Sequence, residues 1–380
     1  MKVGLVFPYN VAKGGGVKEI VFAIQAVLRR RGHDAYILTP RPQDHDGVVP
    51  HEHMIFVGSA ADFNSPTRTT IQISASVNDT IDTILARHNF DVLHFHEPWI
   101  PMLSLQLLSR SNTVNIGTFH AKLPETIISR TMAKVVTPYT KSVLKYIDAF
   151  TAVSDAAAEY VCSQTKQPVT IIPNGIDSKQ YKPPRKIYDD RKQKTILYVG
   201  RLEGRKGVRY LLQAFRLLQN KQPDVHLIIA GDGPDREKLE ELAADLELQN
   251  VSFLGYVPHA DKIKLLQDSD LYCSPAIYGE SFGVVLLEAM ATGLVTVAGD
   301  NPGYASVMNG LGSISLVDPK HAAEFARRLD LLLHETDLRK LWREWAANEL
   351  PKYSYEHIVT QYEEVYLNAL AAKLTQKELA

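Results

Sequence analysis

Short apolar runs alternate along the chain with segments of helix length, and this alternation predicts an α/β protein. The runs in the first half are KVGLVFP, DAYILTP, HMIFVG, DVLHFHE, VNIGTFH, AFTAVS and VTIIPNG. Those in the second half are TILYVGR, VHLIIAGDG, VSFLGYV, LYCSPA and LVTVAG. Near-continuous apolar strands separated by helices are typical of parallel sheets that helices cover on both faces.

A segment rich in charge and proline separates the two series of strands. It runs from Pro173 to Lys194, PNGIDSKQYKPPRKIYDDRKQK, and predicts a linker between two Rossmann-type domains. Two domains also suit a length of 380 residues, because single cores stop growing at about 250–300 residues. The last segment has apolar residues at helical spacing, and the spacing leaves its partner surface open. These residues are Ile358, Tyr362, Val365 and Tyr366.

Composition and charge narrow the class of protein. Hydrophobic residues make up 45% and charged residues 22%, and a net charge of -1 gives no electrostatic argument for a nucleic acid partner. Cys162 and Cys273 belong to no C-x-x-C motif, which argues against a zinc site or a disulfide framework and predicts a cytoplasmic protein. Pro8 and Asn10 break the first apolar run, so we predict a strand there rather than a signal peptide.

One longer apolar stretch, FGVVLLEAMATGLVTVAG, approaches the length of a membrane span. It carries Glu288 and a break at Gly293, which a span would disfavour. We therefore predict a buried helix that ends at Gly293, followed by a strand, and no membrane span.

In open α/β sheets, ligands bind beyond the carboxyl ends of the strands, and the first such place here is a run of glycines. Gly14, Gly15 and Gly16 follow the first strand and precede an amphipathic helix. Their backbone could approach a phosphate at the helix amino terminus, or the loop could simply need positive φ angles. The pattern fits neither a Walker A motif nor a dinucleotide fingerprint, so a nicotinamide or flavin enzyme is not predicted.

Histidines follow two neighbouring strands in the first half. His120 ends the strand in TFHAK, and HFHEP supplies His94, His96 and Glu97. A lone histidine is more often structural than catalytic. His94 and His96 share a strand face, so two-point metal ligation is possible, as is a general base, but no third ligand stands at useful spacing.

Two cations flank a glycine-containing loop in YVGRLEGRKGVRYLLQAF. Arg201 and Lys206 lie just before a predicted helix, a combination that suits a diphosphate. The alternative is a solvated basic turn.

The stretch YGESFGVVLLEAMATG contains two glutamates, Glu280 and Glu288, in apolar surroundings. If it were helical throughout, they would lie about 12 Å apart, beyond the roughly 5–9.5 Å of a glycosidase carboxyl pair. We therefore expect Glu280 in the turn before the helix, accepting hydrogen bonds from ligand hydroxyls, and Glu288 facing another part of the same ligand. The alternatives are a helix cap for Glu280 and a structural pairing for Glu288.

Together these segments resemble the retaining glycosyltransferases of family four, which have the GT-B fold. The resemblance is carried in order by the glycine-rich loop, TFHAK, AVSDAAAEYV, IIPNGID, YVGRLEGRKG, IAGDGP, FLGYVP and the E-x7-E pair in ESFGVVLLEAMATG. It implies two Rossmann-type domains facing a central cleft. Residues 1–174 would form the acceptor side and 175–355 the nucleotide-sugar-binding domain, with a helix at about 356–380 crossing back onto the first.

The resemblance also assigns roles to residues. Arg201, Lys206, Gly15 and Gly16 would hold the diphosphate, Glu288 the ribose, and Glu280 with the backbone of Ser281, Phe282, Gly283 and Val284 the donor sugar, while Tyr256 and Val257 would border the base and His120 the reacting sugar. The implied reaction moves a hexose from GDP-mannose or a UDP-sugar to an acceptor hydroxyl. No cofactor or metal is expected, and the D-x-D triplet at residues 44–46 is interpreted as coincidence.

A closer resemblance, through PYNVAKGGGV, TFHAK and GRKG, is to bacterial phosphatidylinositol mannosyltransferases, which implies a membrane lipid acceptor. The sequence departs from that group at Lys18, where glutamine is common, and in GDNPGYASVM. KLPETIISRTMAKVVTPYTKSVLKYIDAF would be an interfacial helix on the inner membrane face, interrupted by Pro138, or else a solvated helix pair. Its basic residues are Lys122, Arg130, Lys134, Lys141 and Lys145.

Three other functions compete with glycolipid synthesis: transfer to a soluble carbohydrate acceptor, sugar-nucleotide epimerisation on the same fold, and sugar-nucleotide binding without catalysis. Transfer differs from the others in releasing nucleoside diphosphate only when an acceptor is supplied.

Overall fold

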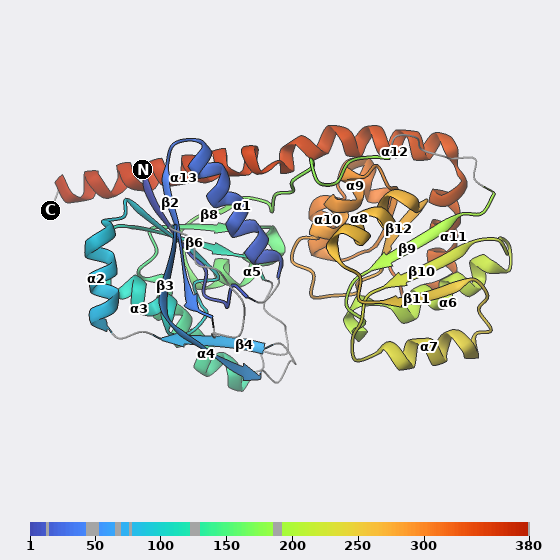
Figure 1. Cartoon of the computed structure of the whole chain (residues 1–380), viewed down its shortest axis with the longest axis horizontal. Coiled ribbons are helices and arrows are strands. Elements are labelled where there is room, and N and C mark those ends of the chain that lie inside the picture. The colour runs from blue at the N-terminus through green and yellow to red at the C-terminus, as the bar shows by residue number, and fades with distance from the viewer. Residues whose placement is uncertain are drawn as a thin grey trace. The chain divides into compact units, whose positions relative to one another are not determined.

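The chain folds into two compact units in a computed structural model, which describes residues 1–12, 15–42, 53–64, 70–75, 78–121, 130–184 and 192–378. Unit 1 comprises Met1–Gly175 together with Tyr355–Ala380, and unit 2 comprises Ile176–Ser354 (Figure 1). Each unit is an α/β sandwich built on one sheet.

Unit 1 contains an eight-stranded sheet in the order β4-β3-β2-β1-β5-β6-β7-β8. Its strands are β1 (Lys2–Val6), β2 (Asp34–Arg41), β3 (Met54–Asn64), β4 (Thr70–Ala75), β5 (Val92–His96), β6 (Val114–Phe119), β7 (Ala149–Ala152) and β8 (Val169–Ile171). All neighbours are parallel except β3 and β4, which pair antiparallel at the edge. The sequence analysis missed β4 because TIQISA alternates polar and apolar positions, whereas the predicted strands were continuous apolar runs.

Six helices belong to unit 1 among the described residues. They are α1 (Gly16–Arg30), α2 (Asn78–His88), α3 (Leu103–Arg110), α4 (Arg130–Leu144), α5 (Asp155–Gln164) and α13 (Tyr355–Glu378). The interruption predicted at Pro138 is wrong, because α4 continues through it. A proline removes only one main-chain donor, and here the flanking turns keep the helical course.

The last helix, α13, completes the core of unit 1. It packs against α1 and β6. Ile358, Val359, Tyr362 and Tyr366 are buried in one cluster with residues of β1 and α1, and Val365 packs against that cluster. The partner surface that helical spacing left open is therefore the α1 side of this sheet.

Charged contacts fasten α13 to the same surface. Arg30 pairs with Glu356, and Arg31 pairs with Glu363. Glu363 also accepts a hydrogen bond from Nε2 of His33 at 2.8 Å. These contacts border the apolar cluster and set the register of α13 along α1.

Unit 2 contains a six-stranded parallel sheet in the order β11-β10-β9-β12-β13-β14. Its strands are β9 (Thr195–Val199), β10 (His226–Ala230), β11 (Val251–Gly255), β12 (Leu271–Ser274), β13 (Thr296–Gly299) and β14 (Leu316–Val317). Its helices are α6 (Val208–Gln219), α7 (Arg236–Asp245), α8 (His259–Asp268), α9 (Val284–Ala291), α10 (Pro302–Val307), α11 (Ala322–His334) and α12 (Thr336–Glu349). Only β14 was not predicted, because two residues are too short to show a periodicity.

The predicted linker is in part a piece of unit 2. Ile176 and Tyr181 are buried, and the Ile176 amide donates to the Tyr353 carbonyl oxygen at 2.8 Å. The charge and proline content of the segment predicted an exposed linker, because the burial of these two side chains depends on tertiary contacts that composition does not show. Residues 185–191 of the segment lie outside the described residues.

The structure also describes the two cysteines and the helix that was considered as a membrane span. Both cysteines are free, Cys162 on the surface and Cys273 buried in β12. Within the described ranges, no helix combines the length and apolar character that crossing a membrane requires.

We predict that α13 contributes strongly to the stability of unit 1. Ile358→Ala should lower the free energy of unfolding by about 2–5 kcal/mol, because it opens a cavity at a fully buried position. Leu367→Ala on the same helix is the matched control, since its side chain is 56% exposed and should cost no more than about 0.5 kcal/mol. Urea unfolding of both variants measures the difference, and equal midpoints would contradict the assigned role of α13.

Candidate functional site

The carboxyl ends of β9, β12 and β13 lie at one edge of the unit 2 sheet, because these strands are parallel neighbours. The loops that follow them lead into α6, α9 and α10. They carry the predicted Arg201, Lys206 and Glu280. This is the edge at which open α/β sheets bind ligands.

Two cations converge on Glu280 at this edge. Lys206 Nζ lies 2.7 Å from Glu280 Oε1, and a terminal nitrogen of Arg205 lies 2.9 Å from the same oxygen. The Glu280 side chain is 13% exposed. A carboxylate this shielded needs such partners, since an unpaired charge there would be costly. We call Arg205, Lys206 and Glu280 the ion-pair cluster.

Arg205 was missed by the sequence analysis, although the signal was present. It stands next to Lys206 in GRK, directly before a helix. The predicted Arg201 instead has a 65% exposed side chain, and its Nε lies 2.9 Å from Glu203 Oε1. Arg205 Nε lies 3.0 Å from the other oxygen of Glu203. Glu203 thus joins Arg201 to the cluster, which Arg201 does not enter directly.

Backbone conformation brings these loops together. Gly207 caps α6 with a φ of 72°, and a Cβ there would lie 2.0 Å from the Pro275 carbonyl oxygen. Only glycine permits both the left-handed conformation and this approach. The Ile277 amide then donates to the Arg205 carbonyl oxygen at 2.9 Å. The start of α6 is therefore held beside the loop that carries Glu280, where a helix amino terminus favours an anion.

Glu280 lies before helix α9, as expected. The helix begins at Val284 and is capped by Gly283, with no side-chain capping bond, so the capping alternative for Glu280 does not hold. The helix ends at Ala291 with Thr292 as its cap, and Gly293 follows with a φ of 71°, so the predicted stop at this glycine is confirmed.

Glu288 has the structural pairing that was left as an alternative. It is buried on α9, and its Oε1 lies 2.7 Å from both Lys262 Nζ and the Tyr181 hydroxyl. Tyr181 comes from the predicted linker and Lys262 from α8. The sequence could not pair residues so far apart along the chain.

The remaining predicted donor-side residues occupy different environments. Ser281 and Val284 are half-buried at the start of α9, and Gly283 has a φ of 113°. The Phe282 ring packs edge-on against Tyr353 with centroids 6.0 Å apart, so its side chain belongs to the core. Beyond β11, Tyr256 is 81% exposed and Val257 half-buried.

Gly15 and Gly16 in unit 1 are exposed at the start of α1. The φ of Gly15 is 165°, which is extended backbone, and a Cβ on either residue would meet no atom within 4 Å. The alternative that the loop needs positive φ angles therefore does not apply to these two, and Gly14 lies outside the described residues.

The histidines gather at the carboxyl ends of β5 and β6. His120 is buried, and its Nε2 lies 2.9 Å from His96 Nδ1. The His120 amide donates to Glu97 Oε1 at 2.6 Å. His94 is bonded through both ring nitrogens, to the Tyr366 hydroxyl at 2.7 Å and the Thr118 hydroxyl at 2.6 Å.

These bonds argue against ligation of a metal by His94 and His96 together, because both ring nitrogens of His94 are already hydrogen-bonded. Among the parts of the chain that are described, no group of three metal-binding side chains comes together. The D-x-D triplet at 44–46 lies outside those parts.

Burial dominates the electrostatics of this cluster. It lowers the pKa of His94 to about 3 and that of His120 to about 4, and it lowers the pKa of His96 well below the usual value. Burial raises the pKa of Glu97 to about 7, although hydrogen bonds from the His120 and Ala121 amides and the Trp99 side chain oppose this shift. The three imidazoles are therefore neutral at neutral pH, and Glu97 is close to half-protonated.

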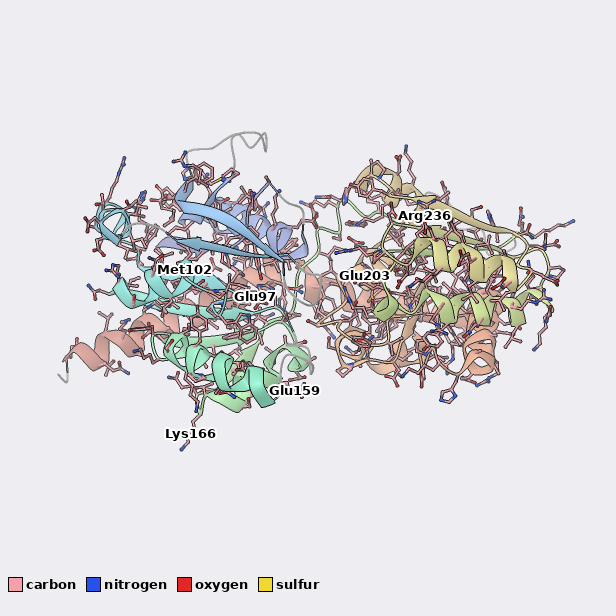
Figure 2. All side chains as sticks on the ribbon, turned by 90° about the horizontal axis from the view of Figure 1, so that it is seen from below. Glu97, Met102, Glu159, Lys166, Glu203 and Arg236 are labelled. Atoms are coloured by element: carbon pink, nitrogen blue, oxygen red, sulfur yellow. The ribbon has the colours of Figure 1, made fainter. Side chains whose placement is uncertain are left out.

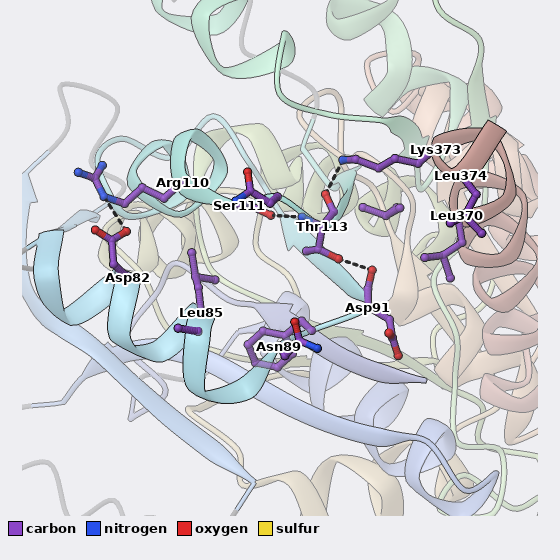
Figure 3. Close-up of a pocket in the computed structure, with 14 residues that line it drawn as sticks. Asp82, Leu85, Asn89, Asp91, Arg110, Ser111, Thr113, Leu370, Lys373 and Leu374 are labelled. Carbon is purple, nitrogen blue, oxygen red and sulfur yellow. Dashed lines mark hydrogen bonds and ion pairs between the residues drawn. The ribbon is translucent and has the colours of Figure 1, made fainter. Parts of the chain in front are cut away.

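A cavity of about 610 Å³ lies at the opposite edge of the unit 1 sheet (Figure 3). It opens before β5 and β6, between α2, α3 and α13. Ion pairs and hydrogen bonds already engage its charges: Arg110 with Asp82 at 3.1 Å, and Lys373 with the Thr113 carbonyl oxygen at 2.6 Å. The cavity is therefore separate from the predicted site residues.

Comparison with known proteins accounts for both units. Residues 14–180 match the family described as Glycosyltransferase Family 4, and residues 181–349 match Glycosyl transferases group 1. The chain is 31% identical to a phosphatidyl-myo-inositol mannosyltransferase of Mycolicibacterium smegmatis over 374 residues, 96% of this chain and 93% of the relative. The chain belongs to glycosyltransferase family four.

Other likenesses extend this result. This glycosyltransferase is also 28% identical to D-rhamnosyltransferase WbpZ of Pseudomonas aeruginosa, and the match covers 80% of its own chain and 79% of WbpZ. Its structure resembles Anabaena HepE in complex with UDP and glucose, with a TM-score of 0.73, 20% identity and coverage of 96% and 99%. The predicted GT-B fold is confirmed, and so is the prediction that the chain is an enzyme, a glycosyltransferase.

We predict that Glu97 lowers the stability of this glycosyltransferase as pH rises. Its pKa is about 7 in the folded chain and near the ordinary value of 4.5 in the unfolded chain, so the carboxyl group loses its proton at lower pH when the chain is unfolded. As pH rises from about 4.5 to about 7, the free energy of unfolding of the wild type should therefore decrease relative to that of Glu97→Gln, by on the order of 3 kcal/mol.

Urea unfolding at several pH values measures this difference. Glu159→Gln is the matched control, because Glu159 lies exposed on α5 (Figure 2) and its substitution should give no such trend. A wild-type to Glu97→Gln difference that does not change with pH would contradict the assignment.

Proposed function

We propose that this glycosyltransferase moves a hexose from GDP-mannose or a UDP-sugar to a hydroxyl group of a membrane lipid, with retention of configuration at the anomeric carbon. The observation that carries the proposal is the ion-pair cluster at the carboxyl edge of the unit 2 sheet, where Arg205 and Lys206 are held together by Glu280. Fixed cations beside the start of α6 suit the diphosphate of such a donor.

The charge change of the reaction explains why cations are needed there. Breaking the bond between the anomeric carbon and the phosphate oxygen leaves negative charge on the diphosphate. Lys206, Arg205 and Arg201, with the α6 amino terminus, would stabilise that charge, and preorganised charge is usually the largest catalytic effect. The open backbone at Gly15 and Gly16 would approach the same phosphates.

The other donor contacts follow from the carboxylates. Glu280 and the main chain of residues 281–284 would bind the sugar hydroxyls, Glu288 the ribose, and Tyr256 and Val257 would border the base. Glu288 would do so while Lys262 and Tyr181 hold its Oε1 in place. A carboxylate has several lone pairs, so these bonds leave it acceptor capacity.

We assign no enzyme nucleophile. The acceptor oxygen would form its bond on the face that the diphosphate leaves, the carbon–phosphate-oxygen bond would break, and the acceptor proton would pass to the leaving phosphate. His120 would lie beside the reacting sugar. No metal is required in this scheme, because the basic residues neutralise the diphosphate.

A lipid acceptor is supported by the printed name of the 31% identical relative, a phosphatidyl-myo-inositol mannosyltransferase. Lys141 and Lys145 are exposed at the end of α4, next to the buried Val143 and Leu144. A basic surface anchored on the core suits an anionic membrane on the inner face. Lys122 lies outside the described residues, as do the side chains of Arg130 and Lys134.

We expect Lys206→Ala to lower kcat by about a hundredfold or more, because it removes a cation that faces the leaving diphosphate. It should also reduce the thermal stabilisation of the protein by GDP or UDP, since a ligand raises stability only as far as it binds. The preferred nucleoside diphosphate in the wild-type panel would indicate the donor.

Lys264→Ala is the matched control, because the Lys264 side chain is 72% exposed on α8 and forms an ion pair only with Asp261 among the described residues. Unchanged turnover in Lys206→Ala would overturn the phosphate assignment. A product with inverted anomeric configuration, seen by NMR, would overturn retention.

We expect the protein to float with anionic liposomes and the double variant Lys141→Glu, Lys145→Glu to float less, because each basic residue contributes about 1 kcal/mol near such a surface. Lys166→Glu, at an exposed position after α5 (Figure 2), is the control. Recovery of the wild-type protein in the soluble fraction would contradict peripheral attachment.

A further inference from the structure

Four buried polar atoms lie near the carboxyl ends of the unit 1 strands and have no hydrogen-bond partner among the residues that the structure describes. They are His96 Nε2, Glu97 Oε2, His120 Nδ1 and Asn174 Oδ1. Buried polar atoms in folded proteins usually have partners, so neighbouring exceptions suggest that a ligand supplies the missing bonds. Glu97, labelled in Figure 2, belongs to the interior of this unit.

The number of ring protons limits what this cluster can offer. His96 and His120 are both neutral, and one hydrogen lies between His96 Nδ1 and His120 Nε2, which are 2.9 Å apart. If His96 donates, the proton of His120 is on Nδ1. If His120 donates, its Nδ1 is a bare acceptor and His96 Nε2 carries a buried, unpaired N–H.

Asn174 distinguishes the two arrangements. Its side chain acts on His120 as a hydrogen-bonding group that raises the pKa of the ring, so it lies close to the ring although the two side chains do not meet the geometry of a full hydrogen bond. With the proton on Nδ1, His120 presents a donor beside Asn174 Oδ1. The other tautomer places two bare acceptors there and leaves a donor unpaired at His96, which is the costlier arrangement because unpaired buried N–H groups are rare.

The ring of His96 also packs against a neighbouring ring whose position is fixed. It lies against His94 with centroids 4.2 Å apart, and both nitrogens of His94 are bonded, one to Tyr366 of α13 and the other to Thr118 of β6. His94 is therefore fixed between the sheet and the last helix, and its ring restricts the rotation of His96.

The main chain of His120 is held independently. Glu97 Oε1 accepts from the His120 amide at 2.6 Å. Glu97 reaches it with a φ of 55°, an uncommon conformation for a residue with a side chain. The Glu97 amide donates to the Thr118 carbonyl oxygen at 2.8 Å, which holds this bend.

We propose that His96 is a positioning residue for sugar transfer: it donates its Nδ1 proton to Nε2 of His120 and thereby keeps the proton of His120 on Nδ1. His120 Nδ1–H and Asn174 Oδ1 then offer a donor and an acceptor to one hydroxyl group, which is both acceptor and donor itself. A sugar hydroxyl fits both atoms. This inference rests on the proposed place of His120 beside the reacting sugar.

Variants of His96 test the proton assignment. His96→Leu removes the donor and should lower kcat roughly tenfold to a hundredfold while the KM for the nucleotide sugar changes by no more than about threefold. His96→Asn keeps an amide N–H near the position of Nδ1 and should recover at least tenfold of that loss, whereas His96→Gln places its amide near Nε2 and should not. His88→Asn on α2, a histidine outside the site, is the control and should leave turnover unchanged.

Nitrogen-15 NMR of the histidine rings shows which nitrogen of His120 carries the proton, and this would not change if His96 had only a structural role. Wild-type His120 should show a protonated Nδ1 and an unprotonated Nε2, and His96→Leu should shift this balance. Wild-type turnover in His96→Leu, or a protonated Nε2 in wild-type His120, would overturn the proposal. If His96→Leu does not fold, the contrast between His96→Asn and His96→Gln and the wild-type NMR still decide.

His120→Ala separates this inference from the function on which it rests. Full activity in His120→Ala would remove His120 from the proposed reaction. Lost activity in His120→Ala, together with full activity in His96→Leu, would leave the proposed function standing and reject only the positioning role.

Discussion

Parallel pairing of strands is the constraint on which both candidate regions depend. Because β5 and β6 run in the same direction, their carboxyl ends adjoin, and His96 meets His120 across 24 positions of sequence. The parallel β9, β12 and β13 bring Lys206 to Glu280 across 74 positions. Antiparallel neighbours would place these residues at opposite edges. Polar chemistry can thus gather at an edge while the strands remain almost wholly apolar.

Buried charge is compensated at each glutamate of the E-x7-E pair, and in different ways. Glu280 is held by two cations at the surface of the sheet edge, where a ligand could exchange with them. Glu288 is buried on the helix and is held by Lys262 and the Tyr181 hydroxyl. Breaking a buried pair leaves an uncompensated charge, so each partner fixes its carboxylate in position. The two glutamates therefore differ in how freely their charge can be redirected toward a ligand.

Much of the fold was predictable because it rests on local apolar patterns: nearly all strands, the α/β class and the turn that carries Glu280. The E-x7-E pair and the glycine-rich loops also pointed correctly to the family. Tertiary contacts account for what was missed. Tyr181 reaches Glu288 only after folding, and His94 finds Tyr366 272 positions later. Arg205 was overlooked although it adjoins Lys206, because spacing alone gave no reason to prefer it over Arg201.

The place of α13 in the core of unit 1 has a consequence for synthesis of the chain. The cluster around Ile358 and Tyr362 needs residues that emerge from the ribosome only after all of unit 2. At roughly 5–20 residues per second, the apolar surface on α1 waits on the order of ten seconds or more for its partner. Unit 2 is continuous and can fold first. The unit that begins the chain is thus the last to be completed, and its α1 face stays uncovered until α13 has been synthesised.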